Sequence, residues 1–250
     1  MKRFFLFSLA ILMLGACRKK EDPAAPAPTG PAKVTVSFEN VAGSQPLVLD
    51  SVWYRNANGD SVKVSEYKYY ISNVVLESDT TKYNEEESYH LIDQRDDNSK
   101  VFELKDIPEK TYNKISFMVG VDSRHNTAGA QTGALDPIHG MFWDWNQGYI
   151  MAKMEGYSPQ SPIGGRISYH IAGFKGEYSV LVNVTLNLPQ PLIVKEGSIH
   201  NIHLKADMLE WFKTPSTVSI NQTSVVGAVG PDALRFANNY ADMFSVDHID

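Results

Sequence analysis

The stretch Gly140–Tyr149, GMFWDWNQGY, holds two of the four tryptophans of the chain, Trp143 and Trp145. His139 directly precedes it. In an extended chain, residues two apart point to the same side, so we expect the two indoles to lie together. Such a pair can fill the core, offer a stacking platform for a sugar or a base, or form part of a redox site. Composition alone favours the core, and the other two roles stay open.

Histidine supplies the other candidate chemistry, because imidazole is a common ligand of transition metals. No two histidines form an HxH or HExxH motif. His200 and His203 are three apart, so they would face opposite sides of a strand. A metal site would therefore have to assemble from distant segments. The seven histidines are His90, His125, His139, His170, His200, His203 and His248.

No motif of a familiar enzyme class occurs in the chain. The sequence lacks a GxSxG nucleophile elbow, a Walker phosphate loop, a GxGxxG motif before a helix and a zincin helix. The plentiful acidic residues leave room for a glycosidase carboxylate pair, although no pattern marks one. The single cysteine, Cys17, lies in a segment that predicts lipid attachment and not nucleophilic catalysis. We therefore expect a protein that is not an enzyme.

The composition is typical of a globular protein. The 250 residues are 43% hydrophobic and 21% charged, which argues against disorder, collagen and a coiled coil. The formal net charge is −6 and no long basic run occurs, so we expect no nucleic-acid partner. A mean hydropathy of −0.26 excludes a polytopic membrane protein. The aromatic share of 11% favours strands.

The first 32 residues predict a targeting signal and a tether. A basic start is followed by the apolar run Phe4–Leu14, which is too short to span a bilayer. The next residues, LGAC, end at Cys17 and resemble a bacterial lipobox. That resemblance implies a signal peptide over 1–16, acylation of Cys17 and anchoring to the outer membrane, on its periplasmic face or at the cell surface. Residues 17–32 become rich in Pro and Ala, as in an extended linker.

Residues 33–250 predict a single all-β domain. Val34, Val36 and Phe38 alternate with polar residues, which is the period of a half-buried strand. Asn58-Gly59 is a hairpin-turn signal. Many short strands at this spacing predict an antiparallel β-sandwich with Greek-key, immunoglobulin-like connections. The further strand-like runs are Pro46–Tyr54, Ser61–Glu77, Ser88–Asp93, Val101–Leu104, Tyr112–Asp122, Gln147–Gly156, Gly165–Ala172, Glu177–Leu188 and Ser198–Asp207.

Two segments break this pattern. Residues 123–146 show little periodicity and predict a long aromatic loop, and loops of this length are usually functional or disordered. In Gly230–Phe244, Leu234, Ala237, Ala241 and Phe244 follow helical spacing, and Pro231 suits a first turn. We therefore expect a short helix near the C-terminus.

Several stretches resemble the MbnP-like copper-binding proteins, the periplasmic partners found beside methanobactin genes, whose relatives include MopE and CorA of methanotrophs. The longest and most specific is GALDPIHGMFWDWNQGYIMAKMEG, around the tryptophan pair. The others are YKYYISNVVL, YHLID, RISYHIAGFKG and, as in many Bacteroidetes members, ANNYADMFSVDHI. The resemblance covers most of residues 33–250.

The resemblance implies a β-sandwich that binds copper outside the cytoplasm. In the best-understood relatives, a tryptophan beside the copper is oxidised to kynurenine by a di-haem peroxidase-like partner. By position, Trp143 or Trp145 would be the modified or shielding residue here. Acylation of Cys17 leaves no thiolate, so histidine would dominate the site. His170 is the preferred ligand because it lies in a segment that resembles the family. One or two of His139, His203 and His248 would join it.

Two other functions compete with copper binding. A glycan- or peptide-binding surface lipoprotein would use the Trp143 and Trp145 loop as its stacking platform. A structural or adhesive module would bury the same pair and bind no small ligand. The family resemblance favours copper uptake, storage or handover over both.

Overall fold

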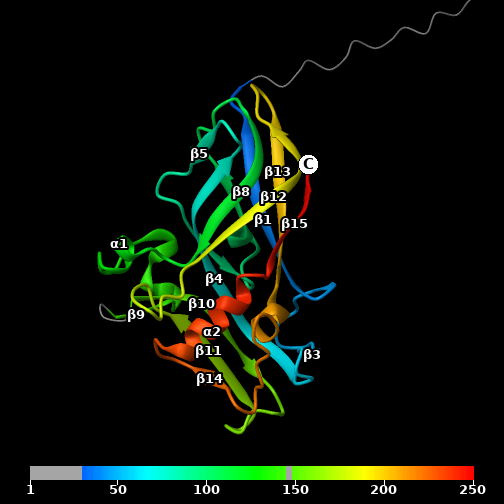
Figure 1. Cartoon of the computed structure of the whole chain (residues 1–250), viewed down its shortest axis with the longest axis vertical. Helices are drawn as coiled ribbons and strands as arrows, with labels where there is room; N and C mark the ends of the chain where they lie inside the picture. The colour runs from blue at the N-terminus through cyan, green and yellow to red at the C-terminus, as the bar shows by residue number, and fades with distance from the viewer. Residues whose placement is uncertain (1–29, 145–147) are drawn as a thin grey trace, which may run out of the picture.

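The computed structural model describes residues 30–144 and 148–250, and it consists of two β-sheets (Figure 1). Side chains of both sheets share one hydrophobic core. The prediction of an all-β, sandwich-like domain is confirmed. The first sheet has the order β15-β13-β1-β2, and β7 also pairs with β1. Its strands are β1 (Lys33–Ala42), β2 (Gln45–Pro46), β7 (Val101–Leu104), β13 (Ile199–Asp207) and β15 (Phe244–Ile249).

The second sheet has the order β12-β8-β4-β10-β11-β14, with β3, β5 and β6 also paired with β4 and β9 paired with β10. Most pairings in both sheets are antiparallel, whereas β1–β13 and β11–β14 are parallel. The strands of the second sheet are β3 (Tyr54–Arg55), β4 (Ser61–Glu77), β5 (Lys82–Asn84), β6 (Tyr89–Asp93), β8 (Thr111–Val119), β9 (Phe142–Asp144), β10 (Gly148–Tyr157), β11 (Arg166–Ala172), β12 (Val182–Ile193) and β14 (Val225–Val226).

The long strand β4 divides the second sheet into two halves. Tyr69 pairs with β6 on one edge and with β10 on the other, whereas Ile71 pairs with β6 and β8. Consequently β10 and β8 follow one another along the same edge of β4. The register shifts near Asn73, whose φ of 52° marks the bulge between the halves.

An aromatic cluster joins the two sheets. Phe38 of β1 lies 5.9 Å from Phe117 of β8 and 6.2 Å from Tyr69 of β4, measured between ring centroids. Phe244 of β15 lies 5.1 Å from Phe117 and 5.8 Å from Tyr69 in the same way. Phe244 is only 6% exposed. The first residue of β15 is therefore anchored in the core, and the rest of the strand extends from it along β13.

The helical elements are short. Helix α2 packs Tyr240 against Trp211 of η4, with 5.2 Å between the ring centroids. Within residues 30–144 and 148–250, no helix is long and apolar enough to cross a bilayer. The helices are α1 (Ser123–Asn126) and α2 (Pro231–Tyr240), and the 3-10 segments are η1 (Asp97–Lys100), η2 (Gly133–Leu135), η3 (Pro137–His139) and η4 (Met208–Phe212).

Three of the sequence predictions are wrong in detail, and one is the run Glu177–Leu188, because β12 begins and ends five residues later. The run Pro46–Tyr54 is not one strand, because β2 ends at Pro46 and β3 begins only at Tyr54. Proline lacks the N–H that would continue a ladder. The C-terminal helix ends at Tyr240, and Phe244 begins β15. Phe244 follows Leu234 at helical spacing in the sequence, but it belongs to a separate strand, so the spacing predicts too long a helix.

The long aromatic loop is tied down by buried polar contacts. Asn126 is 1% exposed, donates to the carbonyls of Val121 and Asp122, and accepts from the backbone N–H of Tyr149 at 2.8 Å. The hydroxyl of Tyr149 donates to the Leu135 carbonyl at 2.7 Å. These bonds connect the beginning and the middle of the loop to Tyr149 at the start of β10.

Candidate metal centre

Strand pairing brings His203 of β13 directly opposite His248 of β15. Their rings stack with centroids 4.0 Å apart and planes 13° apart. The register shifts between this pair and the neighbouring pair Leu204–Val246, so Asp247 is an extra residue in β15. Adjacent residues of a regular strand face opposite sides. The bulge therefore explains how Asp247 reaches the ring of the adjacent His248.

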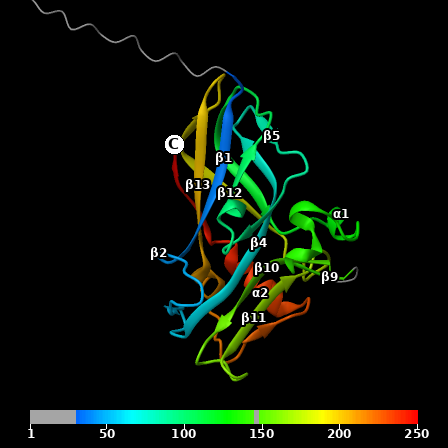
Figure 2. The same ribbon diagram turned by 180° about the vertical axis from the view of Figure 1, so that it is seen from behind.

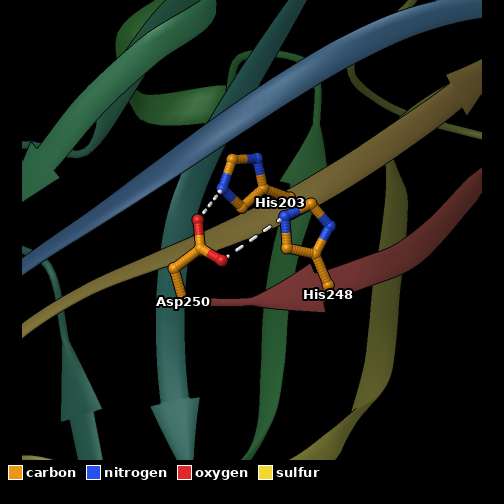
Figure 3. Close-up of side chains that lie close together, drawn as sticks. All are labelled: His203, His248 and Asp250. Carbon is orange, nitrogen blue, oxygen red and sulfur yellow. Dashed lines mark hydrogen bonds and ion pairs between the residues drawn. The ribbon is translucent and has the colours of Figure 1, made fainter.

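Asp250, two residues after His248, completes a group of three potential ligands (Figure 3). One carboxylate oxygen of Asp250 and one ring nitrogen of each histidine lie within 4.8 Å of one another. The carboxylate is 3.0 Å from Nε2 of His203 and 3.6 Å from Nε2 of His248. Two imidazoles and a carboxylate suit borderline divalent ions such as Cu(II) and Zn(II). The group has the donor types and the convergence of a transition-metal site.

The Nδ1 atom of each ring contacts an oxygen that can accept its proton. Nδ1 of His248 lies 2.8 Å from Oδ2 of Asp247, and Nδ1 of His203 lies 3.1 Å from Oγ of Ser37 in β1. If each Nδ1–H donates to its oxygen, both Nε2 atoms carry a lone pair. A lone pair and a carboxylate 3.0 Å apart, as at His203 and Asp250, repel each other unless a proton or a cation joins them. A proton on Nε2 of His203 would join the two groups by a hydrogen bond, and a cation in its place would join them as ligands.

Asp247 is held in its ionised form. Nζ of Lys205 lies 2.5 Å from Oδ1 of Asp247. The hydrogen bond from Lys205, followed by that from His248, lowers the pKa of the Asp247 carboxyl below its ordinary value. The ionised carboxylate is the acceptor that raises the basicity of a ligating imidazole.

Replacing Asp247 by asparagine should weaken metal binding by about 10-fold, because the shape is kept while the charged acceptor behind His248 is lost. Competition against a chromophoric chelator would measure the Kd for Cu(II). Asp79→Asn, in an exposed turn after β4, removes the same charge elsewhere and should leave the Kd unchanged. Equal weakening in both variants would mean that only net charge matters.

The three side chains line the surface of the protein. Their exposed fractions are 31% for His203, 50% for His248 and 69% for Asp250. Both histidines border a surface pocket of about 370 Å³ that also includes Ser37 and Asp247. An ion can therefore enter directly from solvent, and further coordination positions are open to water or to donors of another molecule.

His170, the preferred ligand from the sequence, lies in the other sheet. It stands on β11 opposite Lys153 of β10, and its Nε2 is 2.7 Å from Oε1 of Glu155. The half-buried Trp143 of β9 lies beside it, with 6.3 Å between the ring centroids. In both views β9 lies on the side of the molecule away from the end of β15 (Figures 1 and 2). His170 thus neighbours a tryptophan and not the His203–His248 pair.

The structure also separates the remaining sequence candidates from this pair. His139 ends η3, where its Nε2 lies 3.0 Å from the Gly133 carbonyl, and it is not in the group of three. Trp143 packs against the hydrophobic core. Trp145 and Cys17 lie outside the described residues. Of the four histidines proposed from the sequence, the structure brings together His203 and His248.

Sequence reasoning missed Asp250. The signal was present in His248-Ile249-Asp250, because residues two apart on a strand share a face. The helical spacing predicts a helix up to Phe244, so the sequence gives no reason to expect a strand over residues 244–249. Asp247 was missed for a different reason, since only the bulge turns it toward His248.

Comparison with known proteins identifies one family. The family model for MbnP matches residues 31–229. Among solved structures, MbnP from Methylosinus trichosporium is similar, with a TM-score of 0.52 and 16% sequence identity over 80% of this chain and 82% of that chain. At that identity the structural likeness concerns the fold. No significantly similar sequence was found among curated proteins.

Proposed function

The chain belongs to the MbnP family, and we propose that it is an extracytoplasmic copper-binding protein that holds the ion at His203, His248 and Asp250. The observation that carries this proposal is the convergence of two Nε2 atoms on one carboxylate. Family membership supports copper as the ion, and the geometry supports where it binds.

The donor set favours Cu(II). Imidazole nitrogen and carboxylate oxygen are borderline to hard donors, and Cu(II) has the highest affinity of the first-row divalent ions for such sites. The methionines near the tryptophan pair, Met141, Met151 and Met154, are fully buried in the core. They therefore serve packing, and the thioether donors that would favour Cu(I) are not exposed to an incoming ion.

We further propose that the protein is not an enzyme and acts in copper uptake, storage or handover, anchored through an acylated Cys17 to the bacterial outer membrane. An exposed site with open coordination positions suits transfer of the ion to a partner. The Pro- and Ala-rich tether of residues 17–32 would hold the domain away from the lipid.

The contact between Trp143 and His170 supports a second candidate location for copper. If a di-haem peroxidase-like partner oxidises Trp143 to kynurenine, the new aryl amine would stand beside the His170 imidazole. This contact supports a modification-dependent site in the second sheet. The packing of Trp143 against the core gives less support to a glycan-stacking platform.

The test is to purify residues 33–250 from the native host and to measure metal content together with peptide masses. One equivalent of copper on an unmodified chain is the result expected for the His203–His248–Asp250 site. Oxidation of tryptophan to kynurenine adds about 4 Da to the peptide that holds Trp143 and Trp145. Copper found only on chains with that added mass would move the site to His170. A chain that takes up no copper in either form would contradict the proposed function.

A further inference from the structure

A second cluster of metal-ligand side chains lies away from the His203–His248 pair, around the hydroxyl of Tyr89. This hydroxyl is 2.5 Å from Oδ2 of Asp122 and 2.5 Å from Nδ1 of His125. Nδ1 of His125 is in turn 3.2 Å from Oδ1 of Asp122. A phenol oxygen, a carboxylate and an imidazole nitrogen therefore converge on one point.

The backbone holds these three groups in place. Tyr89 begins β6, and Asp122 and His125 flank the start of α1. The Asp122 carboxylate also accepts from the backbone N–H of His125 at 3.0 Å, which fixes one ligand relative to the other. The adjacent Asn126 is buried and bonded to the carbonyls of Val121 and Asp122. Donors fixed by the main chain lose little conformational entropy when an ion binds.

The cluster is accessible and its surroundings are acidic. Tyr89 and His125 border a cavity of about 480 Å³ on the side of η2 and another of about 140 Å³ that also includes Asp122. Glu87 borders both cavities, and its Oε2 lies 3.5 Å from Nε2 of His125 while its side chain is 76% exposed. An incoming cation would thus meet an exposed carboxylate before it reaches the fixed donors, although Arg124 partly offsets this charge at the smaller cavity.

We propose that Tyr89, Asp122 and His125 form a site for ferric iron, independent of the copper site. Two of the three donors are hard oxygen atoms, and imidazole also suits iron. On binding, the Tyr89 O–H bond breaks, the proton passes to water, and a bond from the phenolate oxygen to Fe(III) forms with no change in oxidation state. Ligand bonds of about 2.0–2.2 Å separate neighbouring ligand atoms by about 3 Å. The Tyr89 oxygen therefore needs to move by only a few tenths of an ångström.

The experiment is a titration of the full chain with ferric citrate, followed by the visible charge-transfer band that tyrosinate gives with Fe(III). We expect the band in the unaltered chain and its loss in Tyr89→Phe. Asp122→Asn should weaken iron binding at least 10-fold, and asparagine remains a good helix cap, so this variant tests the ligand without removing the cap. Tyr157→Phe alters an exposed tyrosine elsewhere and should keep the band.

Two results would overturn the iron site. One is the absence of a visible band with the unaltered chain at saturating ferric citrate. The other is a band that persists in Tyr89→Phe, which would assign the iron to another tyrosine. Far-UV circular dichroism of each variant separates lost binding from lost folding, and the Asp122→Asn result decides the matter if Tyr89→Phe does not fold.

Discussion

Replacing His248 by alanine should raise the Kd for Cu(II) by at least about 100-fold, or roughly 3 kcal/mol. The substitution removes one of two imidazoles and also leaves the Asp247 carboxylate without the ring to which it is bonded at 2.8 Å. The remaining His203 and Asp250 offer only two donors. Isothermal titration or chelator competition on the soluble domain would measure the change. The side chain is half exposed, so the stability of the fold should change little.

His170→Ala is the informative companion to this variant. His170 is less exposed than His248, at 22% against 50%, makes one carboxylate contact at 2.7 Å and lies in the other sheet. On an unmodified chain it should bind copper as the unaltered protein does. The opposite pattern, with copper lost from His170→Ala and retained by His248→Ala, would refute the site at the end of β15 and favour the one beside Trp143.

The fold was largely predictable because it follows from local patterning. Ser61–Glu77 is rich in β-branched and aromatic residues, and it forms β4 with the predicted bounds. The hairpin signal Asn58-Gly59 lies between β3 and β4, and Gly59 takes the positive φ of 84° that such a turn requires. What local patterning did not indicate is the parallel pairing of β1 with β13, which joins the two ends of the domain.

The candidate site was less predictable because it depends on register. His203 and His248 were both proposed from the sequence, but nothing in the sequence states that they are cross-strand partners. That relation arises because β15 is anchored at Phe244 and carries a bulge at Asp247. A slip of one residue would turn His248 to the other face. His170 was preferred on family resemblance, and a segment that matches a family need not contribute to a metal site.

Replacing Phe244 by alanine should lower the free energy of unfolding by about 3–5 kcal/mol, since it empties an aromatic position in contact with Phe38, Tyr69 and Phe117. The same change should weaken copper binding, because β13 is the one described strand with which β15 forms a ladder, and β15 carries His248 and leads directly into Asp250. Chemical denaturation and copper titration of one preparation would measure both effects.

Phe102→Ala is the matched control for this coupling. Phe102 stacks on Phe38 at 6.1 Å between ring centroids, but it belongs to β7 on the far side of β1 from β13. Its loss should destabilise the domain and leave the Kd for copper unchanged. If Phe244→Ala also leaves the Kd unchanged, copper binding does not depend on the anchoring of β15.

The effect of copper on stability tests the same coupling from the other side. An ion that binds only the folded chain stabilises it by about 2.7 kcal/mol at 100 times its Kd. Copper should therefore recover part of the stability that Phe244→Ala loses, and at the same concentration it should recover at most about 0.4 kcal/mol in a Phe244→Ala/His248→Ala double variant.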